Sequence, residues 1–222
     1  MNLAFRMRPL NLSEFFGQEH LVGPGKLITR MVETKSLSSM ILWGPPGSGK
    51  TTLAQIIAQS VGADFHQISG VTSGKEDLLK IIEIAKGNKG NEGDKGKQTI
   101  LFIDEIHRWN KAQQDALLPY VESGLLILIG ATTENPSFEV ISPLLSRARV
   151  FVLSGLSEEH LEKIIDRALS DRDKGLGKYS KMLGKEAKEL VIRLSGGDAR
   201  IMLNALEISV TQFKEKEITP EI

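Results

Sequence analysis

The sequence predicts an α/β fold in which a five-stranded parallel sheet is flanked by helices and is followed by a small all-helical region. Two observations lead to this prediction. Short apolar runs alternate with amphipathic helical patterns over the larger, amino-terminal part of the 222 residues, as in βα units around a sheet buried on both faces. After Leu153 only helical patterns follow. We therefore expect two domains, residues 1–154 and residues 155–222.

Five short, mostly apolar runs are the candidate strands. Runs of this length between helical patterns are typical of strands buried in a parallel sheet. In chain order they are MILW (40–43), FHQIS (65–69), TILFID (99–104), LLILIG (125–130) and VFVL (150–153).

Helical periodicity lies between these strands and after the last of them. Apolar residues spaced i, i+3, i+4 and i+7 form the stripe of a helix packed on a sheet or on another helix. Ser157 can cap a helix that carries acidic residues in its first turn, and another helix is expected from Asp198 to about Phe213. The stripes are Leu78, Ile81, Ile82 and Ala85; Leu161, Ile164, Ile165 and Leu169; and Ala187, Leu190, Val191 and Leu194.

Two segments lack such a pattern. Gly87 to Lys97, GNKGNEGDKGK, is too polar and too rich in glycine to pack, so we expect a mobile surface loop. At the carboxyl end, Thr219 can cap a helix with Pro220 at its first position, but only two residues remain after Pro220. We interpret this unfinished helix signal as a sign that the chain was cut from a longer protein, before a further carboxyl-terminal domain.

Composition excludes several classes of protein. No apolar run approaches the roughly 20 residues that span a bilayer, and the start has no apolar segment before a cleavage site, so we expect a cytoplasmic protein with no membrane partner. The absence of cysteine excludes disulfides and thiolate metal sites. The 28 basic and 28 acidic residues balance, so any DNA contact must come from a local patch or from an assembled oligomer.

The strongest motif is GPPGSGKTT, which follows the strand MILW and opens an amphipathic helix. This context is that of a P-loop, whose backbone N–H groups and helix N-terminus face phosphate oxygens, although a glycine-proline turn is the bland alternative. Lys50 would reach the β- and γ-phosphates of ATP, and the Thr51 hydroxyl would ligate Mg²⁺. The predicted phosphate-binding residues are Gly44, Pro45, Pro46, Gly47, Ser48, Gly49, Lys50, Thr51 and Thr52.

Polar residues also end the third and fourth candidate strands. Asp104 and Glu105 follow TILFI at the edge of the sheet where ligands bind; Asp104 would support Mg²⁺ and Glu105 would orient or deprotonate the attacking water. An acidic pair at a strand end is commonplace by itself, but a P-loop in the same series favours catalysis. Thr133 can place a hydroxyl beside the γ-phosphate, although threonines there are also ordinary turn residues. We assign His107 a structural role, with catalysis as the alternative.

Four stretches in this order resemble the AAA+ ATPases of the clamp-loader and branch-migration clade. They are GPPGSGKTT, LFIDEIHRWNKAQQDALLP, LIGATTENPSFEV and LLSRARVF. More narrowly, the sequence is similar to the RarA/MgsA family of replication-associated recombination ATPases, whose eukaryotic relative is the Werner-helicase-interacting protein. The similarity runs from RMRPLNLSEFFGQEHLVG to SGGDARIMLNALE and covers nearly the whole chain. DEIHR followed by ATTENPSFEV is much more specific than a P-loop alone.

The resemblance implies roles for further residues. Thr133 matches sensor 1, Arg147 matches the arginine finger that acts on a neighbouring subunit, and Arg200 matches sensor 2 on the helical lid. An arginine supplied across an interface stabilises the charge that spreads over the γ-phosphate oxygens, and Arg147 lies away from the P-loop along the sheet. The alternative for Arg147 is an arginine that is only solvated or salt-bridged. For Arg149 we keep this structural interpretation. The implied adenine-site residues are Arg8, Pro9, Gly17, Gln18 and Val22.

Two departures from the family pattern leave the charges needed for catalysis in place. Ala148 replaces the cysteine of the Ser-Arg-Cys motif, and RIM follows Ala199 where basic residues are common. The resemblance implies ATP hydrolysis with Mg²⁺, coupled to DNA remodelling or recombination at stalled or gapped replication forks. It also implies a homo-oligomer, a tetramer for the full-length protein, with single-stranded or forked DNA and a single-stranded-DNA-binding protein as partners.

Two alternatives remain open at this point. One is a nucleotide-binding assembly subunit that does not hydrolyse ATP, as occurs within clamp loaders. The other is a Holliday-junction branch-migration motor.

Overall fold

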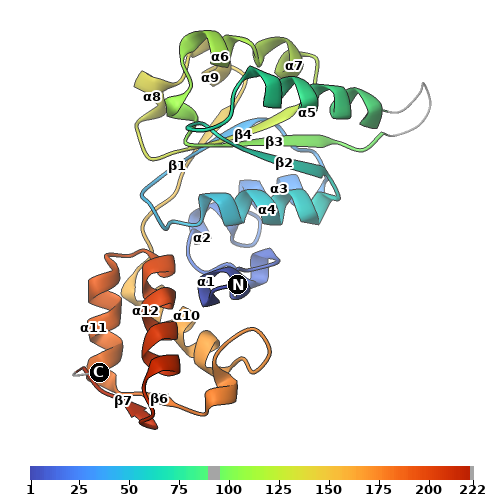
Figure 1. Ribbon diagram of the computed structural model, residues 1–222. Coiled ribbons are helices and arrows are strands. Elements are labelled where there is room, and N and C mark those ends of the chain that lie inside the picture. The colour runs from blue at the N-terminus through green and yellow to red at the C-terminus, as the bar shows by residue number, and fades with distance from the viewer. Residues whose placement is uncertain (90–95, 221–222) are drawn as a thin grey trace. The chain divides into compact units, whose positions relative to one another are not determined.

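The computed structural model describes residues 1–89 and 96–220, which form two compact units (Figure 1). The core unit comprises Gln18–Pro45 and Gly49–Leu153, and the helical unit comprises Met1–Gly17, Pro46–Ser48 and the chain from Ser154 onward. The sequence-based division at residue 154 stays a proposal. In the structure, Leu3 and Met7 are buried among the carboxyl-terminal helices, so the first residues of the chain pack with the helical unit.

The core unit contains the predicted five-stranded parallel sheet, with strand order β2-β3-β4-β1-β5. Strands β1 and β3 begin and end where the sequence predicts, β2 begins one residue earlier, β4 is shifted by two residues and β5 by one. The strands are β1 Met40–Trp43, β2 Asp64–Ser69, β3 Thr99–Asp104, β4 Ile127–Thr132 and β5 Arg149–Val152.

Helices cover both faces of this sheet (Figure 1). Helices α3 and α4 lie on one face, and α5, α6 and α7 lie on the other. The predicted stripe on α5 packs into a core with Ile41 and Leu101 from the sheet. The core-unit helices are α2 Glu19–Val22, α3 Leu27–Glu33, α4 Lys50–Val61, α5 Lys75–Asn88, the 3₁₀ helix η2 Ile106–Arg108, α6 Lys111–Asp115, α7 Leu118–Glu122, α8 Pro136–Glu139 and α9 Ser142–Leu145.

The register of the sheet aligns the carboxyl ends of its strands. Trp43 at the end of β1 pairs with Thr132 at the end of β4, and Asp104 at the end of β3 pairs with Ser69 at the end of β2. Because all five strands are parallel, the segments that follow them leave from one edge of the sheet, which is where ligands bind in α/β proteins. The predicted P-loop, the acidic pair Asp104 and Glu105, and Thr133 lie at this edge, whereas Arg147 precedes β5.

The helical unit has its own apolar core, built from one face of each long helix. Ser157 caps α10, since its Oγ accepts a hydrogen bond from the His160 backbone N–H at 3.3 Å, and Asp198 caps α12 through the Arg200 N–H at 2.8 Å. The elements are α1 Leu3–Arg6, η1 Leu12–Glu14, α10 Glu158–Ser170, η3 Gly177–Tyr179, β6 Met182–Leu183, α11 Lys185–Ser195, α12 Ala199–Gln212 and β7 Glu217–Ile218.

Two details differ from the sequence-based expectations. The helical unit contains a short parallel pair, β6 with β7, because Ile218 is buried and its carbonyl accepts a hydrogen bond from the Gly184 N–H. The proposed cap at Thr219 directly follows this strand, and residues 221–222 lie outside the described residues.

The predicted loop begins later than expected. Helix α5 continues through Gly87 and Asn88, and the Asn88 amide donates hydrogen bonds to Asp64 and Thr99. Residues 90–95 of the predicted loop lie outside the described residues. Among the helices of the described ranges, none has the length and apolar character needed to cross a membrane.

Candidate active site

The P-loop segment connects β1 to α4. It leaves the sheet at Gly44 and enters the helix at Lys50, with Gly47 (φ +75°) and Gly49 (φ +92°) in the left-handed region that favours glycine. The first N–H groups of α4 have no partners further back in the helix, and the helix dipole adds positive character there. The segment therefore has the backbone form of an anion-binding turn.

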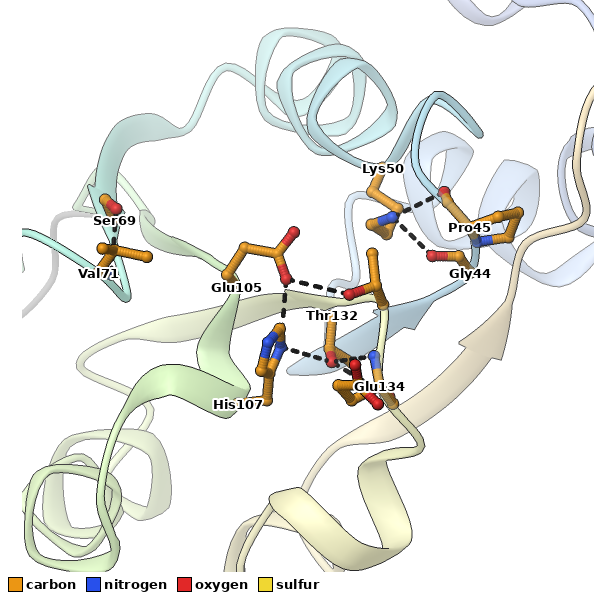
Figure 2. Close-up of polar contacts among 10 residues, drawn as sticks. Gly44, Pro45, Lys50, Ser69, Val71, Glu105, His107, Thr132 and Glu134 are labelled. Atoms are coloured by element: carbon orange, nitrogen blue, oxygen red, sulfur yellow. Dashed lines mark hydrogen bonds and ion pairs between the residues drawn. The ribbon is translucent and has the colours of Figure 1, made fainter. Parts of the chain in front are cut away.

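Lys50 is the charged centre of this turn. The residue is only 8% exposed, and its Nζ donates hydrogen bonds to the Gly44 carbonyl at 2.7 Å and the Pro45 carbonyl at 2.9 Å (Figure 2). A buried ammonium needs acceptors, and a phosphate oxygen is a stronger acceptor than a neutral carbonyl because it carries charge. The site thus fits a phosphate group. Thr51 and Thr52 follow in the first turn of α4 and are half-buried.

The acidic pair lies where β3 ends. Asp104 is the last strand residue, and its carbonyl accepts a hydrogen bond from the Gly70 N–H at 2.7 Å. Glu105 follows in the left-handed region, with φ +54° and ψ +51°, which costs roughly 1–2 kcal/mol for a residue with a Cβ. Such strain is found where the surrounding structure holds a residue for function.

The Glu105 carboxylate, after β3, contacts residues that follow both β3 and β4. Its Oε2 lies 3.1 Å from His107 Nδ1 and accepts a long hydrogen bond of 3.4 Å from Thr133 Oγ1. His107 Nδ1 also lies 3.0 Å from Thr132 Oγ1 (Figure 2). The structure therefore brings together Glu105 and Thr133, which the sequence placed in one site, and adds His107 to them.

Arg147 lies two residues after the end of α9 and is bound within its own chain. Its Nη2 is 2.7 Å from a carboxylate oxygen of Glu122 on α7, and its Nη1 donates to the Pro143 carbonyl at 2.8 Å. Both side chains are well exposed, so this ion pair contributes at most about 1 kcal/mol and separates readily. Arg149, at the start of β5, is also exposed.

The helical unit carries a second cationic group of residues. Arg200 lies in the first turn of α12, is exposed, and its guanidinium is 3.4 Å from the Asp198 carboxylate. Burial, and secondly the positive charge of Arg200, lower the pKa of Arg8, whose guanidinium stacks over the Phe5 ring at 5.3 Å. The positive charges of Arg8 and Arg200 repel each other, and an anion bound between them would stabilise both.

The remaining predicted adenine-site residues are divided between the two units. Pro9 and Gly17 belong to the helical unit, whereas Gln18 and Val22 belong to the core unit. Gly17 and Gln18 are both buried and both left-handed, with φ of +78° and +63°. The Gln18 carbonyl accepts hydrogen bonds from the N–H groups of Leu21 and Val22, which starts α2.

The residues predicted to hold Mg²⁺, Thr51 and Asp104, offer one hydroxyl and one carboxylate. Mg²⁺ is commonly held by one or two protein oxygens together with substrate phosphates and water, so this pair is a suitable donor set. Within residues 1–89 and 96–220 there is no cluster of three or more His, Cys, Asp or Glu side chains able to hold a metal ion by themselves.

Sequence reasoning missed two contacts of the predicted residues. The structural role assigned to His107 does not include a contact with Glu105, although the position of His107 two residues after Glu105 in DEIHR is a signal for that contact. Glu122 was not singled out at all. No local pattern connects it with Arg147, because the two are separated by 25 residues and meet only in the folded core unit.

A parallel sheet with a P-loop after β1, an acidic pair after β3 and a hydroxyl residue after the intervening strand β4 defines a P-loop nucleoside triphosphatase. A family model, the ATPase family associated with various cellular activities (AAA), matches residues 40–156. Because this match covers more than half of the chain, the protein belongs to the AAA ATPase family.

Curated relatives narrow the similarity and confirm the resemblance inferred from the motifs. Replication-associated recombination protein A of Escherichia coli K12 is 50% identical over 206 residues, which cover 93% of this chain and 45% of the relative. The protein of the same name in Bacillus subtilis is 44% identical over 96% of this chain and 49% of its own length. ATPase WRNIP1 of Dictyostelium discoideum is 43% identical over 99% of this chain and 24% of its own length. The chain spans less than half the length of these relatives.

A solved structure confirms the fold. The Thermotoga maritima RuvB Holliday junction branch migration motor is similar with a TM-score of 0.72 and 30% identity, over 97% of this chain and 70% of RuvB. The α/β fold with a five-stranded parallel sheet, predicted from the sequence, is therefore confirmed by the structure and by this comparison.

Proposed function

We propose that this protein hydrolyses ATP with Mg²⁺ and couples the cycle to remodelling of DNA at stalled or gapped replication forks. The observation that carries the hydrolytic part is the placement of Glu105. Its carboxylate is held at the end of β3 by contacts to His107 and Thr133, on the edge of the sheet from which the P-loop also leaves. A P-loop alone binds nucleotide, whereas a held carboxylate at the same edge supplies a base.

In this proposal the P-loop residues 44–52 bind the phosphates and Lys50 neutralises the β- and γ-phosphates. Arg200 approaches the phosphates from the helical lid, and the adenine contacts are Arg8, Pro9, Gly17, Gln18 and Val22. Thr51 and Asp104 would hold Mg²⁺, which supplies neutralisation of the charge that develops on the phosphate oxygens.

Glu105 orients the attacking water and accepts its proton as the water oxygen bonds to the γ-phosphorus. The bond from that phosphorus to the β,γ-bridging oxygen breaks at the same time, which leaves ADP and phosphate. The Thr133 hydroxyl contacts the γ-phosphate or its attacking water. Both side chains already meet through the 3.4 Å hydrogen bond, so little reorganisation is required.

Arg147 acts in trans, on the nucleotide of a neighbouring subunit, in a homo-oligomer that is a tetramer in the full-length protein. Its weak pairing with Glu122 leaves it available to a partner. Residues 1–154 and 155–222 act as core and lid. Single-stranded or forked DNA binds to the oligomer, because a single chain without net charge has no electrostatic attraction to DNA as a whole. We also propose a cytoplasmic location and an association with a single-stranded-DNA-binding protein.

The test measures ATP binding and hydrolysis by the full-length protein with single-stranded, duplex and forked DNA. Glu105→Gln should lower turnover by about 100-fold or more and preserve ATP binding, because the amide keeps the size of the carboxylate but cannot accept the proton. Lys50→Ala, as the control, should lose binding as well. If no DNA stimulates the wild-type protein, the DNA role is wrong; if the wild-type protein binds ATP without turnover, the non-hydrolysing assembly subunit is the better assignment.

The similarity to RuvB supports one competing function, a Holliday-junction branch-migration motor. A synthetic four-way junction separates the two possibilities. Processive branch migration of that junction by the full-length protein would favour the motor, whereas ATP turnover stimulated by forked or gapped DNA without junction migration favours fork remodelling.

A further inference from the structure

His107 is a buried polar side chain in the middle of the candidate active site. It lies in η2, two residues after Glu105, and only 6% of its side chain is exposed. Figure 2 shows its imidazole directed at Glu105 and Thr132. One ring nitrogen, Nδ1, contacts both Thr132 Oγ1 at 3.0 Å and Glu105 Oε2 at 3.1 Å.

The partners of Nδ1 determine where its hydrogen lies. An ionised carboxylate accepts hydrogen bonds only, so a bare Nδ1 lone pair 3.1 Å from Glu105 Oε2 would be repelled. Nδ1 must therefore carry a hydrogen, whichever charge the ring has, and that hydrogen is shared between Glu105 and Thr132. This assignment follows from the hydrogen-bond partners.

The Thr132 hydroxyl cannot donate a hydrogen bond to His107 Nδ1, because its own hydrogen is already used in a hydrogen bond to another acceptor. The residue is fully buried, its Oγ1 donates to the Glu134 carbonyl at 3.1 Å, and it accepts from the Glu134 N–H at 3.0 Å. The hydroxyl is thus a fixed acceptor that anchors the imidazole to the end of β4. The contact from Thr133 to Glu105 is longer, at 3.4 Å, so His107 makes the shorter of the two contacts to Oε2.

We propose that His107 is a positioning residue for hydrolysis: its Nδ1–H holds the carboxylate of Glu105 in the orientation that receives the attacking water. This inference rests on the proposed role of Glu105 as the base. The Glu105 side chain is 34% exposed, so without His107 only the longer hydrogen bond from Thr133 keeps it from turning toward solvent. The imidazole therefore joins the strand that bears the base to the strand that bears the hydroxyl residues.

The test compares two replacements of the same ring in the full-length protein. In His107→Phe a ring of similar size remains without a donor, whereas in His107→Asn the side-chain amide nitrogen lies as many bonds from Cα as Nδ1 does. His107→Phe should lower kcat roughly ten- to a hundred-fold, the range expected for a lost hydrogen bond to a charged group, while KM for ATP changes less than about three-fold. His107→Asn should recover most of kcat.

Equal losses in both variants would identify a packing role, and unchanged kcat in both would also overturn the proposal. If His107→Phe does not fold, His107→Gln replaces it, because its amide nitrogen is one bond too far to reproduce Nδ1. Glu105→Gln separates this inference from the proposed function. If Glu105→Gln still hydrolyses ATP at the wild-type rate, the proposed role of Glu105 as the base fails; if it is inactive while His107→Phe turns over normally, only the positioning role of His107 fails.

Discussion

Replacing Gly70 with alanine tests whether the junction of β2 and β3 sets the position of Glu105. Gly70 directly follows β2 and is buried. A Cβ at this position would lie 2.2 Å from the Glu105 carbonyl oxygen and 2.9 Å from the Asp104 carbonyl oxygen. Both obstacles are backbone atoms, so neither can rotate away as a side chain does.

The size of the effect follows from these distances. Real Cβ atoms essentially never approach within 3.0 Å of such an atom, so the Glu105 carbonyl must retreat by about 0.8 Å, the difference between 3.0 and 2.2 Å. Overpacking of this kind costs about 1–3 kcal/mol. In a protein of this size that corresponds to a fall in Tm of roughly 2–12 °C. A shift near 1 Å in a catalytic group lowers the rate by about 100-fold.

Thermal denaturation and ATP turnover of Gly70→Ala measure the two effects. Gly87→Ala is the matched control, because Gly87 is an exposed residue within α5 and a Cβ there meets nothing within 4 Å. Alanine is favoured over glycine in a helix by about 1 kcal/mol, so this variant should be slightly more stable and fully active. If Gly70→Ala matches the wild-type protein in both Tm and turnover, the close approach of β2 to Glu105 does not position that residue.

Two further predictions concern arginines. Arg147→Ala should lower ATP turnover of the oligomer by about 1,000-fold without changing Tm by more than a few degrees. Mixing Arg147→Ala subunits with Lys50→Ala subunits should restore part of the activity, because the second variant supplies Arg147 to the intact P-loop of the first. No recovery in the mixed oligomers would contradict action in trans. In the helical unit, the hydrogen bond that Arg167 donates to Glu14 at 2.6 Å lowers the pKa of Glu14 below its ordinary 4.5. Because the folded pKa is the lower one, the pair stabilises the folded state above about pH 4.5 and loses that effect as pH falls through the folded pKa. The difference in Tm between the wild-type protein and Arg167→Gln, measured by thermal denaturation, should therefore become smaller below pH 4.5. A Tm difference that stays constant from neutral pH to below pH 4.5 would show that ionised Glu14 does not contribute to it.

Local patterns were sufficient for much of the fold. The bounds of β1 and β3 were predicted correctly: β1 is apolar along its whole length, and in β3 the apolar run from Ile100 to Ile103 is bounded by the polar residues Thr99 and Asp104. The cap at Ser157 was also correct, since a cap depends on residues within one helical turn, and the helix expected from Asp198 begins at Ala199 with Asp198 as its cap. The P-loop was recognised for the same reason, because its chemistry lies in consecutive residues.

The local sequence pattern was insufficient where the bounds of a strand depend on pairing with another strand. The prediction ended β4 at Gly130, but pairing with β1 extends it to Thr132, opposite Trp43. The short strand β7 likewise depends on a partner, β6, more than 30 residues earlier in the chain.

The sequence by itself determined the α/β class, the phosphate-binding turn and the acidic pair, because each is encoded by neighbouring residues. Only the tertiary structure decided which side chains hold these groups. His107 reaches Thr132 and Arg147 reaches Glu122 across 25 residues each, through strands and helices that the sheet brings together. A contact between distant residues leaves no periodicity or spacing in the sequence, so the contacts from His107 to Thr132 and from Arg147 to Glu122 became visible only in the folded chain.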